Sequence, residues 1–199
     1  MVRDNAAFAH DDLRVDGERL DPEPGSVLLL NKPVGYVCST SDVPPLVYEL
    51  LPSRFRRRTP IIAPVGRLDR DTSGLLLLTD DGVLNHRLTS PRSHLPRTYR
   101  ATLASDLRGT EAEQFASGTL LLIGEDKPLA AAIMRSVAPR VVELSIMEGR
   151  YHQVRRMFAA VGNHVVALQR VTIGSLSLGD IAEGTWRVLT DSERARLNQ

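Results

Sequence analysis

The sequence predicts an α+β fold built around a largely antiparallel sheet. Segments with the patterns of strands and of helices follow one another irregularly along the 199 residues, without the strict strand–helix–strand order of a parallel sheet. Hydrophobic residues make up 42% of the chain and the net charge is only +1, which excludes the disordered class. A chain of this length can therefore bury a substantial core.

The first half of the chain is expected to contribute two fully buried strands and a short helix. Residues 21–25, with two prolines and a glycine, mark a boundary before the first strand. Continuous apolar runs at 27–30 and 75–79 are typical of strands that are buried on both faces. A short helix over 83–88 is expected to follow the second strand.

The second half is expected to alternate further strands and helices. The strands are predicted at 98–103, 141–147, 165–168 and 186–189. Two short helices are predicted after Thr110 and Thr190, each followed three residues later by a glutamate that would complete a capping box, and the first of them should end at Gly118. The clearest helix is 152–161, where apolar residues recur at helical spacing and Gly162 supplies the C-cap.

The composition also bears on cofactors and location. Cys38 is the single cysteine, which excludes an internal disulfide and a multi-cysteine zinc or iron–sulfur site. Glycine-rich phosphate loops and zinc-spaced histidines are missing from the sequence, so we expect no cofactor and no metal.

The apolar stretches are far shorter than the ~20 residues that span a bilayer. Residues 1–12, with three acids and no apolar run, do not match a signal peptide. We expect a cytoplasmic protein that has no contact with a membrane.

The small net charge conceals blocks of opposite sign. Residues 26–100 sum to +5 and residues 149–179 to +4, and the windows 82–105 and 149–179 contain arginines but no acid. Arginine accounts for 23 of the 25 basic residues, and its guanidinium binds phosphate in bidentate fashion and stacks on bases. A genome-wide preference for arginine would explain that ratio equally well, but it would not explain the missing acids. The windows predict a basic face for a polyanion such as RNA.

The segment 66–74 has the features of a loop that holds a catalytic group. Its glycines bound a stretch of polar residues, and it leads directly into the strand expected at 75–79. A shaped loop packed against a rigid strand positions a reactive side chain well, and Asp69 and Asp71 are the candidate carboxylates. The residues alone leave open that these aspartates only cap backbone amides.

Two arginine clusters are candidates for contact with phosphates. They are Arg150, Arg155 and Arg156, and Arg56, Arg57 and Arg58. The first cluster opens the helix expected at 152–161, where backbone amides already favour anions, so it would neutralise a phosphate or a buried carboxylate. A solvated basic face is the alternative for this cluster. The second cluster is expected in a loop between two prolines and in contact with RNA phosphates.

Beyond these patterns, the sequence resembles the pseudouridine synthases that act on ribosomal RNA. The stretch G-R-L-D-R-D-T-S-G-L-L-L-L-T-D-D-G at 66–82 resembles their catalytic-loop motif. Supporting stretches, in the order of the family, are L-N-K-P-V-G-Y-V-C-S-T at 30–40, L-T-S-P-R at 88–92, R-T-Y at 97–99 and E-G-R-Y-H-Q-V-R-R-M-F-A-A-V-G-N-H-V at 148–165. Residues 36–40, 88–92 and 151–168 most resemble the branch that modifies small-subunit rRNA, and the branch that modifies large-subunit rRNA is the alternative.

The resemblance implies the pseudouridine synthase catalytic fold, in which two α+β halves share one bent, mainly antiparallel sheet with a central cleft. It assigns residues 26–199 to this catalytic domain. Members of the small-subunit branch usually begin with a small RNA-binding domain of the ribosomal-protein type. Residues 1–25 resemble only a remnant of that domain and a linker, so we expect a complete RNA-binding domain to be lacking.

The resemblance also assigns roles to single residues. It makes Asp69 the catalytic carboxylate, Tyr99 the tyrosine that packs on the target uracil and a candidate for proton removal, and Arg155 the basic residue that pairs with the carboxylate. Contacts with RNA are implied for Arg67, Arg150 and Arg156. Asp69 would attack the anomeric carbon, attack the uracil ring or remove a sugar proton, and the sequence does not choose among these routes. None of them needs a cofactor.

The implied partner is ribosomal RNA, or a ribosomal subunit during assembly, bound by a monomer. Two other interpretations stay open at this point. A non-catalytic RNA-binding factor in ribosome assembly would use the same basic face and would be indifferent to Asp69. A glycoside hydrolase or nucleosidase would place two carboxylates across the bond that it cleaves, with Asp71 as the candidate for the second, and it would release free uracil.

Overall fold

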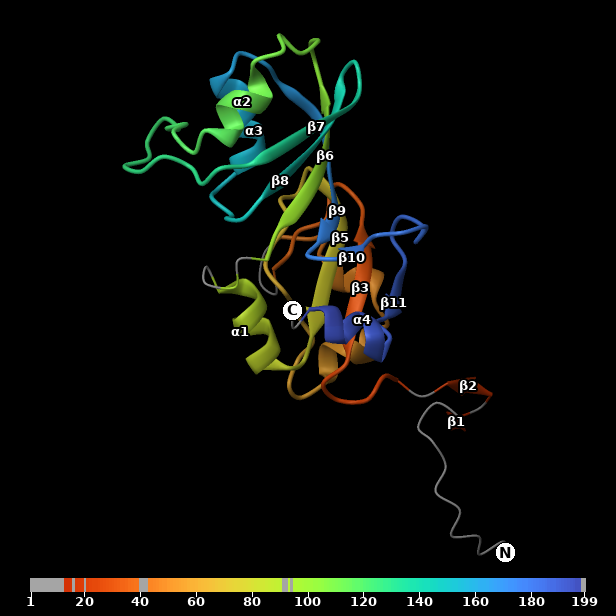
Figure 1. Ribbon diagram of the computed structural model, residues 1–199. Helices are drawn as coiled ribbons and strands as arrows, with labels where there is room; N and C mark the ends of the chain where they lie inside the picture. The colour runs from red at the N-terminus through yellow and green to blue at the C-terminus, as the bar shows by residue number, and fades with distance from the viewer. Residues whose placement is uncertain are drawn as a thin grey trace, which may run out of the picture.

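One mixed sheet of nine strands organises the part of the chain described by the computed structural model, which covers residues 13–15, 17–19, 21–39, 43–90, 93 and 95–197. The strand order is β11-β3-β5-β9-β6-β8-β7, with β4 paired to β5 and β10 paired to β9 (Figure 1). The pairs are antiparallel except β5 with β9, which is parallel. The predicted α+β class with a mainly antiparallel sheet is therefore confirmed.

The elements have the following bounds. The strands are β1 (Arg14–Val15), β2 (Glu18–Arg19), β3 (Val27–Lys32), β4 (Ala63–Pro64), β5 (Thr72–Thr79), β6 (Arg97–Leu103), β7 (Ile133–Ala138), β8 (Val141–Ile146), β9 (Val165–Ile173), β10 (Leu176–Ser177) and β11 (Trp186–Val188). The helices are α1 (Gly82–Thr89), α2 (Glu111–Ala116), α3 (Gln153–Ala160) and α4 (Asp191–Arg196), with short 3₁₀ helices at η2 (Val47–Leu50) and η3 (Ser53–Arg57). The short strands β1 and β2 pair with each other.

The first half of the molecule packs both faces of β3 and β5. Side chains alternate across a strand, so Leu75 and Leu77 of β5 lie in the core beneath α1 and the end of α4. Leu76 and Leu78 lie in the opposite core, together with residues of η2 and η3. This explains why both strands are continuous apolar runs in the sequence.

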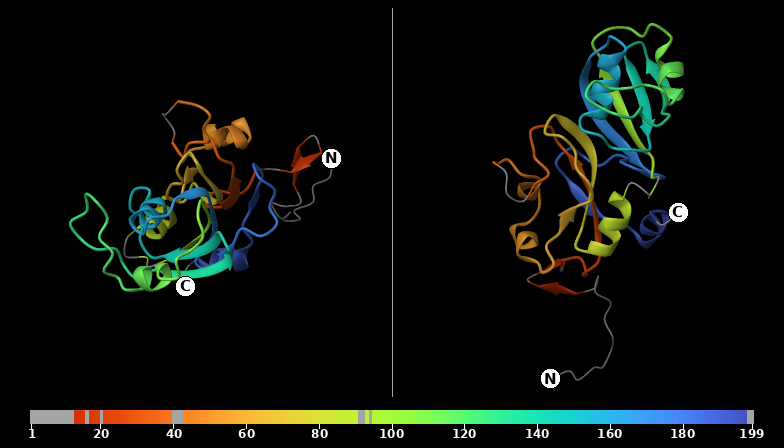
Figure 2. Two further views of the ribbon diagram at one scale, coloured as in Figure 1. Left: turned by 90° about the horizontal axis from the view of Figure 1, so that it is seen from above. Right: turned by 90° about the vertical axis from the view of Figure 1, so that its left-hand side faces the viewer.

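The second half has a core of its own at the other end of the sheet. Helices α2 and α3 cover one face of β6, β8 and β9, and the rings of Phe115 and Phe158 meet edge to face with centroids 5.2 Å apart. Figures 1 and 2 show α2 and α3 at one end of the molecule and α1 and α4 at the other. Two α+β halves thus share one sheet, as the resemblance implied.

Gly74 allows the two halves to join where β5 runs beside β9. Its φ is +102°, and a Cβ at this position would lie 2.8 Å from the backbone nitrogen of Arg170 and closer still to the carbonyl of that residue. The parallel register places Gly74 opposite Arg170. A side chain at this position would force the strands apart.

Most sequence-predicted elements are present, with a few differences. Helix α2 forms, but Thr110 makes no capping hydrogen bond; the Glu111 carboxylate instead accepts from the backbone amides of Arg108 and Gly109. The predicted capping box at Thr110 is therefore wrong, whereas the one at Thr190 is confirmed. The predictions did not include β7.

Among the described helices, none is both long and apolar enough to cross a membrane. Residues 1–12 lie outside the described residues.

We predict that Gly74→Ala lowers the free energy of unfolding by about 2–4 kcal/mol, because the methyl group combines an unfavourable φ with a clash against backbone. Gly82→Ala is the matched control, since a Cβ at Gly82 meets nothing within 4 Å. Urea denaturation of both variants measures the difference. Equal stability of the two variants would contradict this account of the β5–β9 junction.

The ion pair between Arg187 and Glu193 predicts a pH-dependent contribution to stability. Two hydrogen bonds of 2.7 and 2.6 Å join the guanidinium on β11 to the carboxylate on α4, and they lower the pKa of Glu193 to about 2. A lowered carboxylate pKa contributes stability above its ordinary value near 4.5, and the contribution is lost as the pH falls toward about 2.

We therefore expect Glu193→Gln to cost about 1–2 kcal/mol at pH 7, discounted for the partial exposure of Arg187, which corresponds to roughly 2–8 °C in Tm. The Tm difference from the wild type should narrow below pH 4.5. Glu183→Gln, which removes an exposed carboxylate, should leave Tm unchanged at both pH values. A deficit that is constant with pH would refute the assignment.

Candidate active site

A cavity of about 710 Å³ opens between the two halves. Its walls come from the loop that precedes β5, from β6 and β9, and from residues 146–154, which lead into α3. Four of the predicted site residues line it: Arg67, Asp69, Tyr99 and Arg150. The other predicted residues, which do not line it, are Arg56, Arg57, Arg58, Arg155 and Arg156.

Lys32 holds the loop that carries Asp69 to the first half of the molecule. Its side chain is fully buried, and Nζ donates to the carbonyls of Pro33, Asp69 and Thr72 at 3.0, 3.1 and 2.7 Å. The pKa of Lys32 is lowered, chiefly by burial. The negative groups nearby, at Cys38, Asp69 and Asp71, offset part of this effect. Three carbonyl oxygens accept hydrogen bonds from the ammonium in place of water, so the loop is fixed around a buried cation.

Arg155 holds the same loop from the second half. Its Nη2 donates to the carbonyl of Asp71 and pairs with the carboxylate of Asp71, both at 3.0 Å, and its Nη1 donates to the carbonyl of Val165. The predicted pairing of Arg155 with Asp69 is wrong in this structure. The two aspartates are two residues apart on the loop, and Asp71 is the one that pairs with Arg155.

Asp69 faces a histidine in place of that arginine. The Nε2 atom of His152 lies 3.5 Å from Oδ1 of Asp69, and the Asp69 side chain is 38% exposed. His152 has φ 48° and ψ 34°, a left-handed conformation that a residue with a side chain adopts at a cost. Its ring stacks on that of Tyr151, with centroids 3.9 Å apart. The pocket therefore stays open to solvent at Asp69.

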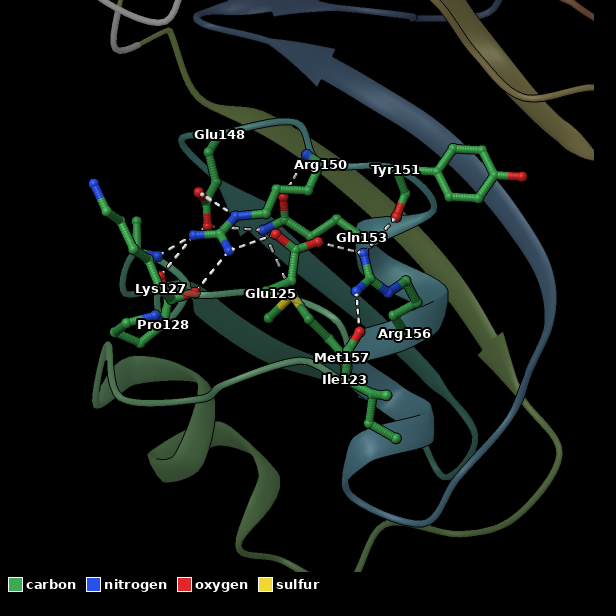
Figure 3. Close-up of polar contacts among 11 residues, drawn as sticks. Ile123, Glu125, Lys127, Pro128, Glu148, Arg150, Tyr151, Gln153, Arg156 and Met157 are labelled. Carbon is green, nitrogen blue, oxygen red and sulfur yellow. Dashed lines mark hydrogen bonds and ion pairs between the residues drawn. The ribbon is translucent and has the colours of Figure 1, made fainter.

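Arg150 and Arg156 pair with Glu125 from another segment, and Arg150 also pairs with the nearby Glu148. Glu125 pairs with Arg150 at 3.0 Å and with Arg156 at 2.7 Å, and Glu148 pairs with Arg150 at 3.1 Å (Figure 3). Hydrogen bonds from Arg156 and Arg150 lower the pKa of Glu125. Both arginines also donate to backbone carbonyls between Ile123 and Pro128. The window 149–179 lacks acids in sequence but not in space, so Arg150 and Arg156 pair with carboxylates of the protein itself, and their predicted contacts with RNA phosphates stay a prediction.

The three arginines at 56–58 have different surroundings. Arg58 pairs with the buried carboxylate of Asp80 at 3.0 Å, whereas Arg56 and Arg57 are exposed and make no ion pair within the described residues. The segment forms the 3₁₀ helix η3 instead of the predicted loop. Arg92 and His94 of the window 82–105 lie outside the described residues.

Several residues of the site were missed from the sequence. Lys32, Arg97, His152 and Arg170 all lie at or beneath the cavity. Lys32 had a usable signal, because it is one of only two lysines among 25 basic residues. Arg97 and Arg170 lie in the acid-free windows, and Arg97 also in the stretch R-T-Y, but their place at the cavity depends on strand neighbours that only the sheet fixes. Within the described residues, no group of three or more His, Cys, Asp or Glu side chains is placed to hold a metal ion.

Comparison with known proteins gives a consistent result. The family model described as RNA pseudouridylate synthase matches residues 26–160. The chain is 47% identical to ribosomal small subunit pseudouridine synthase A of Escherichia coli K12, over 96% of this chain and 84% of that protein. It is 46% identical to the protein of the same name from Yersinia pestis, over 92% and 78%. A crystal structure of a pseudouridylate synthase superimposes with a TM-score of 0.83 at 44% identity, covering 88% of this chain and 75% of that one.

The arginine environments predict separate effects on RNA binding and stability. The double change Arg56→Ala with Arg57→Ala should leave Tm unchanged and should reduce the salt slope of rRNA binding by ~1 per lost phosphate contact. Arg58→Ala should instead cost about 2–4 kcal/mol of stability, because it leaves the buried Asp80 carboxylate without its partner. Salt titrations of binding and thermal melts distinguish the two effects. An unchanged salt slope in the double variant would mean that Arg56 and Arg57 are merely solvated.

Proposed function

The chain belongs to the RNA pseudouridylate synthase family, and on that premise we propose that it converts a uridine of small-subunit ribosomal RNA into pseudouridine. The relatives that carry the small-subunit name match over most of their length. Neither a large-subunit target nor a non-catalytic assembly factor is favoured by these matches. The reaction breaks the bond between the anomeric carbon and N1, turns the uracil and joins the anomeric carbon to C5.

The observation that carries this proposal is the placement of one carboxylate in a rigid loop at the wall of the cavity. Asp69 lines the cavity, while Lys32 fixes its backbone from one half and Arg155 fixes the adjoining Asp71 from the other. A catalytic carboxylate benefits from such positioning because the geometry is set before the substrate arrives. In this proposal, Asp69 acts on the target nucleotide and Arg155 is a positioning residue.

Tyr99 completes the proposed arrangement from β6. It lines the same cavity as Asp69, and an aromatic face at this position would hold the uracil by stacking while the base is turned. The target uridine must leave its stack to reach Asp69, which costs a few kcal/mol and favours unpaired regions of RNA. Because Asp69 is partly exposed in the free protein, the bound RNA must supply the exclusion of water.

The proposal extends to domain organisation and location. The three hydrophobic cores of the described residues draw on residues between Val27 and Leu197, which supports residues 26–199 as one catalytic unit. We propose that this unit acts as a monomer in the cytoplasm, where rRNA or an assembling subunit is available. Pseudouridine mapping of rRNA from a strain without the protein identifies the uridine, and loss of a large-subunit site alone would redirect the proposal.

We predict that Asp69→Asn lowers the rate of pseudouridine formation by on the order of 10⁴-fold, because the amide can neither attack nor accept a proton. RNA affinity should persist, since phosphate contacts supply most of it. Asp71→Asn is the matched control and should stay within about tenfold of the wild type, because the bond from Arg155 to the Asp71 carbonyl remains. Mass spectrometry of the product and a binding titration measure both effects. Near-normal turnover by Asp69→Asn would refute the assignment.

A further inference from the structure

The base of the cavity carries two arginines that no acid neutralises within the described residues. Arg97 donates from Nη2 to the carbonyl of Leu88 at 3.3 Å, and Arg170 donates from Nε to the carbonyl of Leu75 at 2.8 Å. Neither makes an ion pair with a described residue, in contrast to Arg150 at the rim. Both line the cavity.

Arg170 is also incompletely hydrogen-bonded. Its residue is 2% exposed, and its buried Nη2 has no hydrogen-bond partner among the described residues. The buried hydroxyl of Thr72, which also lines the cavity, likewise has no partner there. An unsatisfied buried donor is costly, above all on a charged group. The base of the cavity therefore has donors that await an acceptor.

The sheet places these donors beside Tyr99. Arg170 on β9 is the register partner of Tyr99 on β6, and Arg97 lies two residues before Tyr99 on the same strand. Burial lowers the pKa of Arg97, as does the charge of Arg170 nearby. Asp69 and Glu148 are the carboxylates among the described lining residues, and Glu148 is already bound to Arg150. The base of the cavity is thus a positively charged surface next to the aromatic wall.

We propose that Arg97, Arg170 and Thr72 form a subsite that binds the carbonyl oxygens of the target uracil and stabilises the negative charge that develops on them. The inference rests on the proposed function. When the bond from the anomeric carbon to N1 breaks, its electron pair remains on the uracil and spreads onto O2 and O4. Attack on the ring by Asp69 would also place negative charge on a carbonyl oxygen. The charge is neutralised when C5 bonds to the electron-deficient anomeric carbon, and any bond that Asp69 has formed breaks to return its carboxylate. The proton on C5 then leaves while N1 gains one, so the isomerisation requires no co-reactant.

A uracil carbonyl fits this position better than a backbone phosphate. Arg170 is 2% exposed and lies opposite Tyr99, the side chain proposed to face the base. Fixed donors in a buried site stabilise a developing oxyanion strongly because they need no reorganisation during the reaction. Exposed arginines such as Arg56 and Arg57 are the better candidates for phosphates.

The first test compares Arg97→Gln and Arg170→Gln with Arg100→Gln, an arginine of β6 that pairs with Glu143 outside the cavity. We expect single-turnover pseudouridine formation on small-subunit rRNA to fall 10²- to 10³-fold in the first two variants, with the Kd for RNA changed less than about threefold. Arg100→Gln should react at the wild-type rate. Thermal melts confirm that each variant is folded.

The second test replaces the target uridine by 2-thiouridine or 4-thiouridine, because sulfur is a weak acceptor. When sulfur replaces the contacted oxygen, the rate of pseudouridine formation by the wild type should fall by roughly tenfold or more relative to uridine. Each variant has already lost a donor to that oxygen, so its rate should fall less than about threefold, because the effects of coupled contacts are not additive. If Arg170→Gln does not fold, the thio effect in Arg97→Gln compared with that in the wild type tests the subsite.

Three results would overturn the subsite. Equal thio effects in wild type and variants would exclude contact with the carbonyls, and a salt slope lowered by ~1 with an unchanged rate would identify a phosphate contact. Normal turnover by both variants would mean that bound water alone satisfies these donors. A wild type that forms no pseudouridine in small-subunit rRNA would instead refute the proposed function, so the two failures are distinguishable.

Discussion

The buried ammonium of Lys32 is the interaction on which the geometry of the site depends. It lies at the end of β3 and collects carbonyls from Pro33, Asp69 and Thr72, so that the loop bends around one cation. An ammonium can direct three donors at converging carbonyls, whereas a planar guanidinium cannot adopt that arrangement in the same space. This explains a lysine at position 32 in a chain whose basic residues are otherwise almost all arginine. Asp69 thereby has a defined place before any RNA binds.

The second constraint is the junction between two separately packed halves. Gly74 brings β5 against β9, and that approach places Arg170 opposite both Gly74 and Tyr99. Arg155 then ties α3 to Asp71 across the junction. Each half contributes part of the cavity wall, so the position of Asp69 relative to Tyr99 depends on the packing of the whole sheet. A change at this junction would alter the site without touching a catalytic group.

Electrostatic pairing divides the arginines into two groups with different roles. Glu125 and Glu148 engage Arg150 and Arg156, and these contacts attach the segment 123–128 to the start of α3. Such arginines stabilise the wall of the cavity, whereas Arg97 and Arg170 at its base have no acid partner among the described residues. The second group is available to a ligand that carries or develops negative charge. The same residue type therefore serves structure in one place and recognition in the other.

The sequence by itself determined the elements whose signal is local: the doubly buried strands β3 and β5, helix α3 with its glycine stop, the capping box of α4, and the motif around Asp69. It did not reveal β7, because that strand is an exposed edge with only one intermediate residue in its burial pattern and therefore lacks an apolar period. Only the tertiary structure decided that Arg155 pairs with Asp71, that Glu125 neutralises Arg150 and Arg156, and that Arg170 lies buried without an acid partner among the described residues. The reason is that Coulomb and hydrogen-bond energies depend on distance in space, and residues far apart in the chain become neighbours only when the two halves close on their shared sheet.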